Sequence, residues 1–236
     1  MLYRHLFFDL DHTLWDFESN SRNTLEHLYE ELSLAQRGVD DFYKFHRQYL
    51  GHNEKLWERY RKGFIKQDEL RVKRMWLTLL DFRIADEDLA KTLSVRFLEL
   101  LPTRNQLFPN TLEILRYLQE KEYQLHIITN GFEEVQHHKL KAAALTPFFQ
   151  QIITSEKAGA LKPHRAIYEH ALDASGAVIE ESLMIGDSMD VDIKGAWEMG
   201  MDQIHVNHLD TIKHPIQGNT YPTHTIFELA ELKTIL

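Results

Sequence analysis

The sequence contains no cysteine and no long hydrophobic run. The first absence excludes disulfides and thiolate catalysis. The second excludes an ordinary membrane-spanning helix, and the first residues, MLYRHLFFDLD, lack the apolar stretch of a signal peptide. We therefore expect a protein with no membrane partner, and a cytoplasmic location follows as the default.

Basic residues are also fewer than acidic ones. The 236 residues include 27 Lys and Arg against 36 Asp and Glu, which gives a net charge of -9. This balance argues against a nucleic-acid polymer as partner. Residues 14–104 are neutral overall, so the acidic excess lies in the rest of the chain. An acidic module that acts on an anionic substrate needs a cation between the two. We expect a monomer or a weak homodimer.

Short apolar runs rich in β-branched residues alternate with helical patterns in most of the chain. This alternation predicts a parallel sheet with helices on both faces, so the expected fold class is α/β with a doubly wound, Rossmann-like sheet. Two of the helical patterns end at Gly176 and Gly200, which are stop signals. The expected strands cover residues 3–10, 123–130, 150–155, 182–187 and 202–207.

The segment between residues 18 and 104 has a different texture. It has no convincing strand, and Leu25, Leu28 and Leu32 form a helical stripe. We therefore expect an all-α four-helix domain inserted after the first strand. The expected bounds are 40–62, 66–81 and 86–101 for its later helices, 15–104 for the whole helical insertion, and 1–14 plus 105–236 for the α/β part of the chain.

The first apolar run ends in the stretch FFDLDHTLWD, with carboxylates at Asp9 and Asp11. Taken alone, Asp-x-Asp after a strand is also a common turn signal. The other predicted strand ends decide between the two interpretations, because ligands of parallel sheets bind at the carboxyl ends of the strands. These ends carry further polar groups, namely Thr129 and Asn130, Lys162, Asp187 and Asp192. Acids, a hydroxyl, an amide and an amine together suit a phosphoryl group and a divalent cation.

The chemistry of a phosphate monoester assigns a role to each of these groups. An ionised Asp9 can attack phosphorus without a base. Mg²⁺ would reduce the repulsion between the two anions, with Asp9 and Asp187 as oxygen ligands. Thr129 and Lys162 can bind the phosphoryl oxygens. Asp11 would protonate the leaving oxygen and then take a proton from water.

In this order the residues resemble the four motifs of the haloacid dehalogenase superfamily of phosphohydrolases: DxDxT at 9–13, Thr129, Lys162 and GDxxxxD at 186–192. The resemblance implies Asp9 as nucleophile, Asp11 as acid and base, and Mg²⁺ held by Asp9, Asp187 and the backbone carbonyl of Asp11. It also implies that the helical insertion is a cap. The stretches ITNGF (128–132) and LFPNTLEIL (107–115) resemble the branch that acts on pyrimidine nucleoside 5′-monophosphates.

Several alternatives remain open at this point. Asp192 supports Lys162 or, with Asp190, forms a second pair of metal ligands. Asn130 binds substrate and braces the site, or has a purely structural role in its turn. Trp15 and Phe17 form a flap or pack a hinge.

Most of the basic residues from Lys55 to Arg74 are expected on a solvated helix surface, with a nucleotide-contacting face as the alternative. The pair His137-His138 is expected at the surface and not at a metal site. The rival functions are a sugar-phosphate or phosphoglycolate phosphatase, a phosphomutase, a 2-haloacid dehalogenase, and a non-enzymatic module that accepts a phosphoryl group.

Overall fold

The chain forms two compact units. The computed structural model describes residues 2–208 and 222–236. The first of the two units is a sheet unit, Met1–Phe17 with Asn105–Leu236, and the second is a helical unit, Glu18–Arg104. The sequence-based boundary after residue 14 lies slightly earlier. Trp15 lies in the sheet unit because its backbone forms β-bridges with Asp11 and with Leu107. In the described residues, no helix is both long and apolar enough to cross a membrane.

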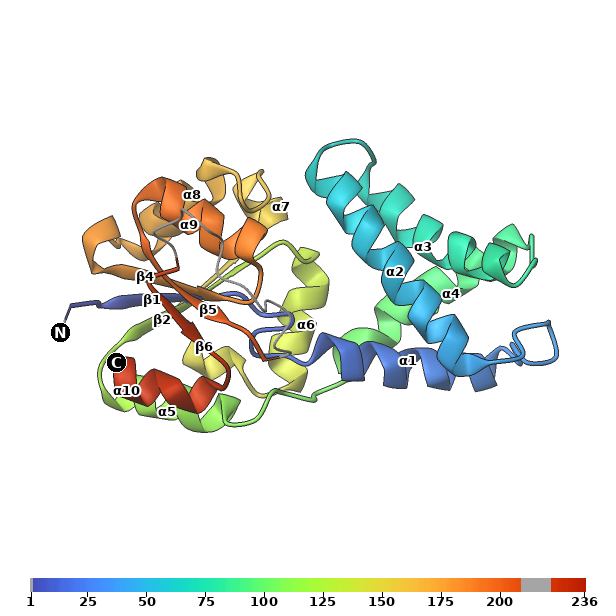
Figure 1. Ribbon diagram of the computed structural model, residues 1–236, viewed down its shortest axis with the longest axis horizontal. Coiled ribbons are helices and arrows are strands. Elements are labelled where there is room, and N and C mark those ends of the chain that lie inside the picture. Colours follow the sequence, from blue (N-terminus) through green and yellow to red (C-terminus); the bar gives the residue numbers. More distant parts are fainter. Residues whose placement is uncertain (1, 209–221) are drawn as a thin grey trace. The chain divides into compact units, whose positions relative to one another are not determined.

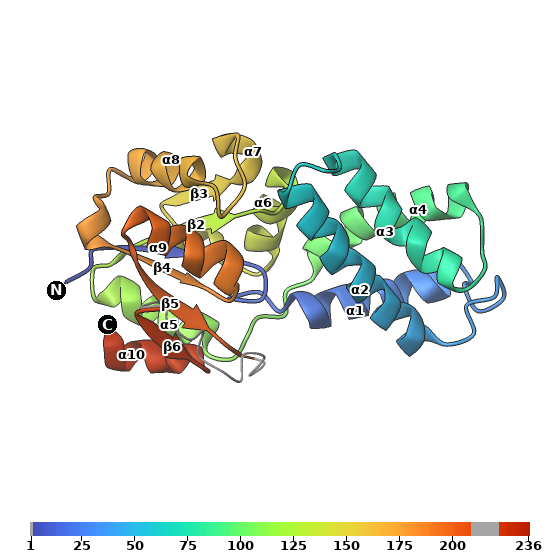
Figure 2. The ribbon, with the colours of Figure 1, turned by 45° about the horizontal axis from the view of Figure 1, so that its top comes forward.

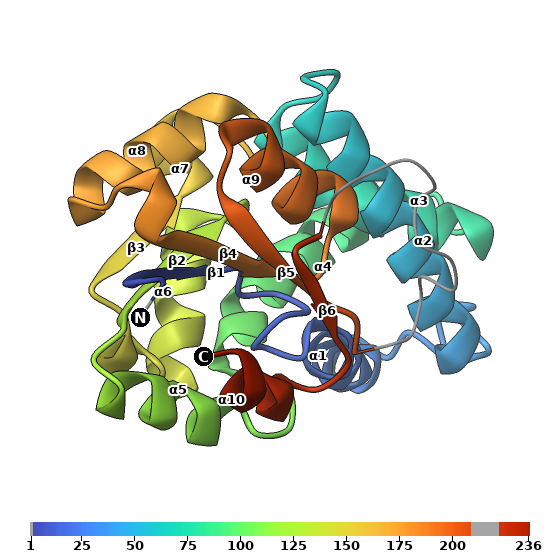
Figure 3. The ribbon, with the colours of Figure 1, turned by 60° about the vertical axis from the view of Figure 1, so that its left-hand side comes forward.

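In its described residues, the sheet unit contains six parallel strands in the order β3-β2-β1-β4-β5-β6. Its strand order reverses direction beside β1, so the carboxyl ends of β1 and β4 mark the expected ligand position of a doubly wound sheet. Helices α8 and α9 cover one face, and α5 and α10 cover the other (Figures 1 and 3). The strands are β1 His5–Phe8, β2 Gln124–Thr129, β3 Gln151–Thr154, β4 Ser182–Gly186, β5 Asp202–Val206 and β6 His224–Ile226.

The central strands are buried on both faces, as parallel strands between two layers of helices must be. Every residue of β1 and β4 is buried. Helix α8 packs on the sheet through a cluster that includes Phe7, Ile128 and Tyr168. The helices of this unit are α5 Thr111–Glu120, α6 Glu133–Ala142, α7 Ser155–Ala158, α8 Arg165–Ser175, α9 Lys194–Met199 and α10 Leu232–Ile235.

The helical unit contains four helices, as the sequence pattern predicts. Figure 2 shows α2 beside α3, and α3 beside α4. Asp41 and Asp86 cap two of these helices, since their side chains accept hydrogen bonds from the backbone N–H groups of Lys44 and Leu89 at 3.0 and 2.9 Å. The bounds are α1 Phe17–Glu31, α2 Phe42–Arg61, α3 Gln67–Asp81 and α4 Glu87–Leu100.

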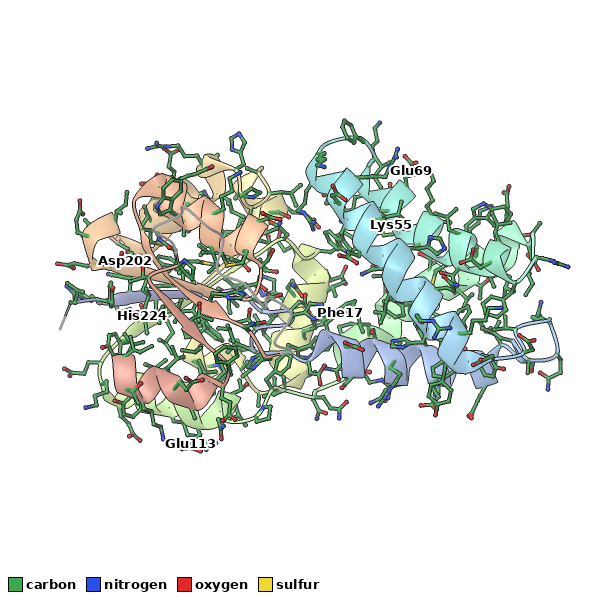
Figure 4. The ribbon with its side chains drawn as sticks, in the orientation of Figure 1. Phe17, Lys55, Glu69, Glu113, Asp202 and His224 are labelled. Carbon is green, nitrogen blue, oxygen red and sulfur yellow. The ribbon has the colours of Figure 1, made fainter. Side chains whose placement is uncertain are left out.

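The basic run from Lys55 to Arg74 lies mostly on the surface of α2 and α3. Figure 4 shows the exposed side chains of Lys55 and Glu69 projecting from these helices. Surface ion pairs such as Lys73–Glu69 at 2.8 Å account for part of the run. Arg74 is the exception, because it is 2% exposed and donates to Asn53 at 2.9 Å. The run is therefore not a uniform solvated face.

Three short elements have no counterpart among the sequence-based expectations: strand β6 and helices α7 and α10. Each has only three or four residues, which is too short for a periodic pattern. Strand β6 extends the sheet by pairing with β5.

A buried histidine pair in the sheet predicts sensitivity to acid. His5 and His126 hydrogen bond at 3.1 Å on neighbouring strands. Burial, and then the neighbouring His5, lower the pKa of His126 from 6.5 to about 4. Between these values the unfolded chain binds more protons than the folded one, so the free energy of unfolding decreases as the pH falls.

We expect wild-type stability to fall by about 2 kcal/mol between pH 7 and pH 5 from this residue alone. Urea unfolding at both pH values measures it. His126→Gln should remove that part of the loss, and the exposed-site control His137→Ala should retain it. An equal pH dependence in wild type and His126→Gln would contradict the assignment.

Candidate active site

The turn after β1 fixes the position of Asp9. The backbone N–H of Asp9 continues the β1–β4 ladder by donating to Ile185 O at 2.9 Å. Directly beyond it the chain folds back, since the N–H groups of Leu14 and Trp15 both donate to Leu10 O. His12 adopts a left-handed conformation with φ 64° within this turn. The result is a nearly buried Asp9 at the carboxyl end of the central strand.

Asn130, directly after β2, fixes the backbone of Lys162 so that the Lys162 side chain reaches Asp9. The Asn130 side chain accepts from Lys162 N at 2.7 Å and donates to Lys162 O at 2.9 Å. The Lys162 ammonium then lies at 2.6 Å from Asp9 Oδ1, 2.7 Å from Ile128 O and 2.7 Å from Asp192 Oδ1. Asp9 and Ile128 O accept hydrogen bonds from this ammonium, and Asp192 forms an ion pair with it. The Asn130 side chain therefore contacts the backbone of Lys162, and its binding of substrate stays a prediction.

Three carboxylates converge beside this ammonium. Asp9, Asp187 and Asp192 offer oxygens that all lie within 4.8 Å of one another. Thr13 Oγ1 donates to Asp187 at 3.2 Å, and Ser188 N donates to Asp192 at 3.0 Å. The packing here is tight, because a Cβ on Gly186 would lie 2.5 Å from Asp192 Oδ2. Glycine at the end of β4 therefore lets Asp192 enter the cluster.

The electrostatics of the cluster favour an additional cation. Burial raises the pKa of Asp9 to about 7; the charge of Lys162 opposes this shift, while that of Asp192 adds to it. Burial and the charges of Asp192 and Asp9 raise the pKa of Asp187 well above its usual value. Fully ionised, the three acids and one ammonium leave two negative charges, which a divalent ion would neutralise.

The donor chemistry of the cluster fits Mg²⁺. This ion prefers hard oxygen ligands and is commonly bound by one or two carboxylates together with waters and substrate oxygens. Both oxygens of Asp192 contact a cation or a donor, Lys162 or Ser188, and its side chain is only 2% exposed, whereas the 11% exposed Asp9 contacts Lys162 through Oδ1; we therefore expect Asp9 and Asp187 to be the carboxylates for a metal. Of the residues with described positions, no other group of three His, Asp or Glu side chains gathers in this way.

A second polar group surrounds Asp11 and Thr129. Lys139 Nζ lies 2.6 and 2.9 Å from the two carboxylate oxygens of Asp11. Gln136 Nε2 donates to Asp11 Oδ2 at 2.9 Å and to Thr129 Oγ1 at 2.6 Å. The fold thus links the two predicted site residues Asp11 and Thr129 through one amide.

Comparison with known families shows which family the chain belongs to. The model of the haloacid dehalogenase-like hydrolases matches residues 3–200. The chain belongs to this family. The sequence-based predictions of the family and of the α/β fold with its helical insertion are thereby confirmed. The relatives described next, which include pyrimidine 5′-nucleotidases, confirm the prediction of a phosphatase.

Relatives of this haloacid dehalogenase-like hydrolase cover nearly its whole length. It is 31% identical to the pyrimidine 5′-nucleotidase PynA of Streptococcus pneumoniae, over 98% of this chain and 94% of that one. It is 28% identical to the glyceraldehyde 3-phosphate phosphatase of Methanothermobacter thermautotrophicus, over 98% of each. The crystal structure of the HAD-hydrolase YfnB from Bacillus subtilis bound to magnesium matches with a TM-score of 0.87 and 28% identity, covering 100% and 99%.

Other sequence alternatives can be compared with positions in the structure. Asp190 is exposed, whereas Asp192 is buried against Lys162. Trp15 is fully buried and Phe17 nearly so, which favours packing over an open flap. His137 and His138 are exposed on α6 and lie in no metal-binding cluster of the described residues.

Sequence reasoning missed three residues that contact the site. His205 on β5 donates to the backbone carbonyl of Asp187 at 2.9 Å, and so supports the loop after β4. Gln136 and Lys139 contact Asp11 from α6. The available signal was their spacing of three residues, which places both on one side of a helix directly after ITNGF.

Proposed function

We propose that the protein is a Mg²⁺-dependent phosphatase that prefers nucleoside 5′-monophosphates, pyrimidine ones first, and forms an aspartyl-phosphate on Asp9. The observation that carries the chemistry is the contact of Lys162 with both Asp9 and Asp192 beside Asp187. The observation that carries the substrate is the full-length similarity to a pyrimidine 5′-nucleotidase. The cytoplasmic location and the monomeric or weakly dimeric state stay predictions.

The residues act in two half-reactions. A carboxylate oxygen of Asp9 attacks phosphorus, the ester P–O bond breaks, and Asp11 gives a proton to the leaving oxygen. Water then attacks the aspartyl-phosphate and transfers a proton to Asp11, which releases phosphate and restores Asp9. Lys162 and the Thr129 hydroxyl bind phosphoryl oxygens as charge accumulates on them.

Mg²⁺ at Asp9 and Asp187, with the Asp11 carbonyl as third protein ligand, would supply positive charge between the nucleophile and the phosphoryl group. We assign the whole reaction to the sheet unit, because every proposed site residue belongs to it.

A sugar-phosphate phosphatase is the second candidate, supported by the similarity to a glyceraldehyde 3-phosphate phosphatase over 98% of the chain. The core chemistry would be the same, so only substrate selection differs. Free phosphate as the product distinguishes either candidate from a phosphomutase. A 2-haloacid dehalogenase is disfavoured, because it needs neither an acid in the position of Asp11 nor Mg²⁺.

A side-by-side assay tests the substrate. We expect uridine or thymidine 5′-monophosphate to exceed glyceraldehyde 3-phosphate, hexose phosphates and phosphoglycolate in kcat/KM, measured as phosphate release. A tenfold preference corresponds to about 1.4 kcal/mol of transition-state discrimination. A tenfold preference in the opposite direction would refute the nucleotide assignment and leave the phosphatase chemistry intact.

A further inference from the structure

Helix α6 places two buried polar side chains against the site. The proposed reaction assigns no role to either of them. Gln136 is 0% exposed and Lys139 is 2% exposed. Their spacing of three residues places them on one face of the helix. Both reach Asp11, and each of the two Asp11 oxygens has at least one N–H donor from this pair. Two polar side chains are therefore buried where their donors meet a single carboxylate.

The orientation of the Gln136 amide follows from its partners. An ionised Asp11 has no proton to donate, so the NH₂ end of the amide must face it. The same nitrogen donates its other proton to Thr129 Oγ1 at 2.6 Å. Thr129 Oγ1 also accepts from Gly131 N at 3.1 Å. Because the hydroxyl oxygen accepts twice, its own proton is left to donate to a third group.

Two neighbouring residues support this arrangement. A Cβ on Gly131 would overlap Gln136 Nε2, so a glycine there lets the amide approach the strand end. The ammonium of Lys139 lies 4.3 Å from the centroid of the Trp15 ring, an attractive contact for a desolvated cation. The aromatic face and the carboxylate together fix the end of a side chain that is flexible in water.

We propose that Lys139 and Gln136 are positioning residues for the phosphatase reaction. Lys139 holds the Asp11 carboxylate, and Gln136 joins it to Thr129 so that the Thr129 hydroxyl donates to a phosphoryl oxygen. This inference rests on the proposed role of Asp11 as acid and base. The ion-paired carboxylate is the form that accepts a proton from the attacking water. Loss of Lys139 should therefore act mainly on hydrolysis of the aspartyl-phosphate.

The test compares Lys139→Met, Asp11→Asn and the double variant with wild type. Lys139→Met should lower kcat for a nucleoside monophosphate by about 10²-fold, in the range of a misplaced acid–base group. With 4-nitrophenyl phosphate, whose leaving group needs no proton, it should still give a rapid burst of nitrophenolate close to one per enzyme, followed by slow turnover. The double variant should be no slower than Asp11→Asn alone, because both changes affect one group.

A matched control and a second variant keep the test decisive. His138→Ala changes an exposed neighbour on α6 and should stay within about twofold of wild type. Gln136→Met should also lower activity, because it removes the amide that orients the Thr129 hydroxyl. It should lower kcat/KM about tenfold in the wild-type background and have little further effect on a Thr129→Val variant.

The inference is overturned if Lys139→Met or Gln136→Met turns over like wild type, or if the losses multiply in the double variants. A slow Asp11→Asn with a normal Lys139→Met overturns this inference alone. Full activity of Asp11→Asn overturns the proposed role of Asp11 and the inference with it.

Discussion

Replacing Asp9 by asparagine is expected to lower kcat by at least ~10³-fold, because an amide cannot form the aspartyl-phosphate. The fold should survive the change. The amide oxygen can still accept from Lys162, and Lys162 retains Ile128 O and Asp192 as partners. Removing one negative charge from three crowded acids also relieves repulsion. We therefore expect a melting temperature equal to or above that of wild type.

Phosphate release and thermal unfolding, measured on the same preparation, separate the loss of chemistry from a loss of folding. The control is Asp190→Asn, an exposed acid from the same loop as Asp187 and Asp192, which should keep at least half of the activity. A folded Asp9→Asn variant that retained a tenth of wild-type kcat would rule out Asp9 as nucleophile.

Removal of divalent metal is expected to abolish turnover, and Mg²⁺ is expected to restore it. Without a cation, Asp9, Asp187 and Asp192 lie within 4.8 Å of one another with a single ammonium between them. Mg²⁺ should also stabilise the folded state, because the unfolded chain has no such cluster. At a concentration 100 times its Kd, a ligand of this kind adds about 2.7 kcal/mol.

Two readouts check the metal site independently. Activity in EDTA, before and after addition of Mg²⁺, tests the requirement for catalysis. The rise in melting temperature with Mg²⁺ tests binding alone, and Asp187→Asn should lose this rise while Asp190→Asn keeps it. Full turnover in the chelated protein, or an unchanged Mg²⁺ shift in Asp187→Asn, would contradict the assignment of Asp187.

The parts of the site that follow directly from the sequence are those at strand ends. Asp9, Thr129 and Asp187 each come at or directly after the last residue of an apolar run, and the topology of a parallel sheet brings such positions to one edge. Lys162 could be anticipated as well, because it precedes the proline that opens the next helical pattern. For these residues, the order of the motifs in the sequence and the topology of the sheet both predict a position at the same edge of the sheet.

The contacts of Asp11 could not be predicted in this way. Gln136 and Lys139 lie in the middle of α6, where Glu133, His137 and His138 are equally polar. Which of these side chains is buried depends on how the helix is rotated about its axis. Packing determines that rotation, and the weak apolar pattern of this helix gave little indication of it. Short elements such as β6 were missed for a related reason, because three residues are too few to show a period.

The position of β1 in the middle of the sheet has a consequence for the order in which the protein can assemble during synthesis. β1 precedes the other described strands along the chain, yet its partners are β2, Gln124–Thr129, and β4, Ser182–Gly186. Domains generally fold as units as they emerge, and local contacts form before distant ones. The helical unit, Glu18–Arg104, can therefore pack before either partner strand of β1 has been synthesised. A nascent chain that stops before Gly186 would carry Asp9, the proposed nucleophile, without β4 and without Asp187 and Asp192, so the carboxylate cluster forms only after that strand has been synthesised.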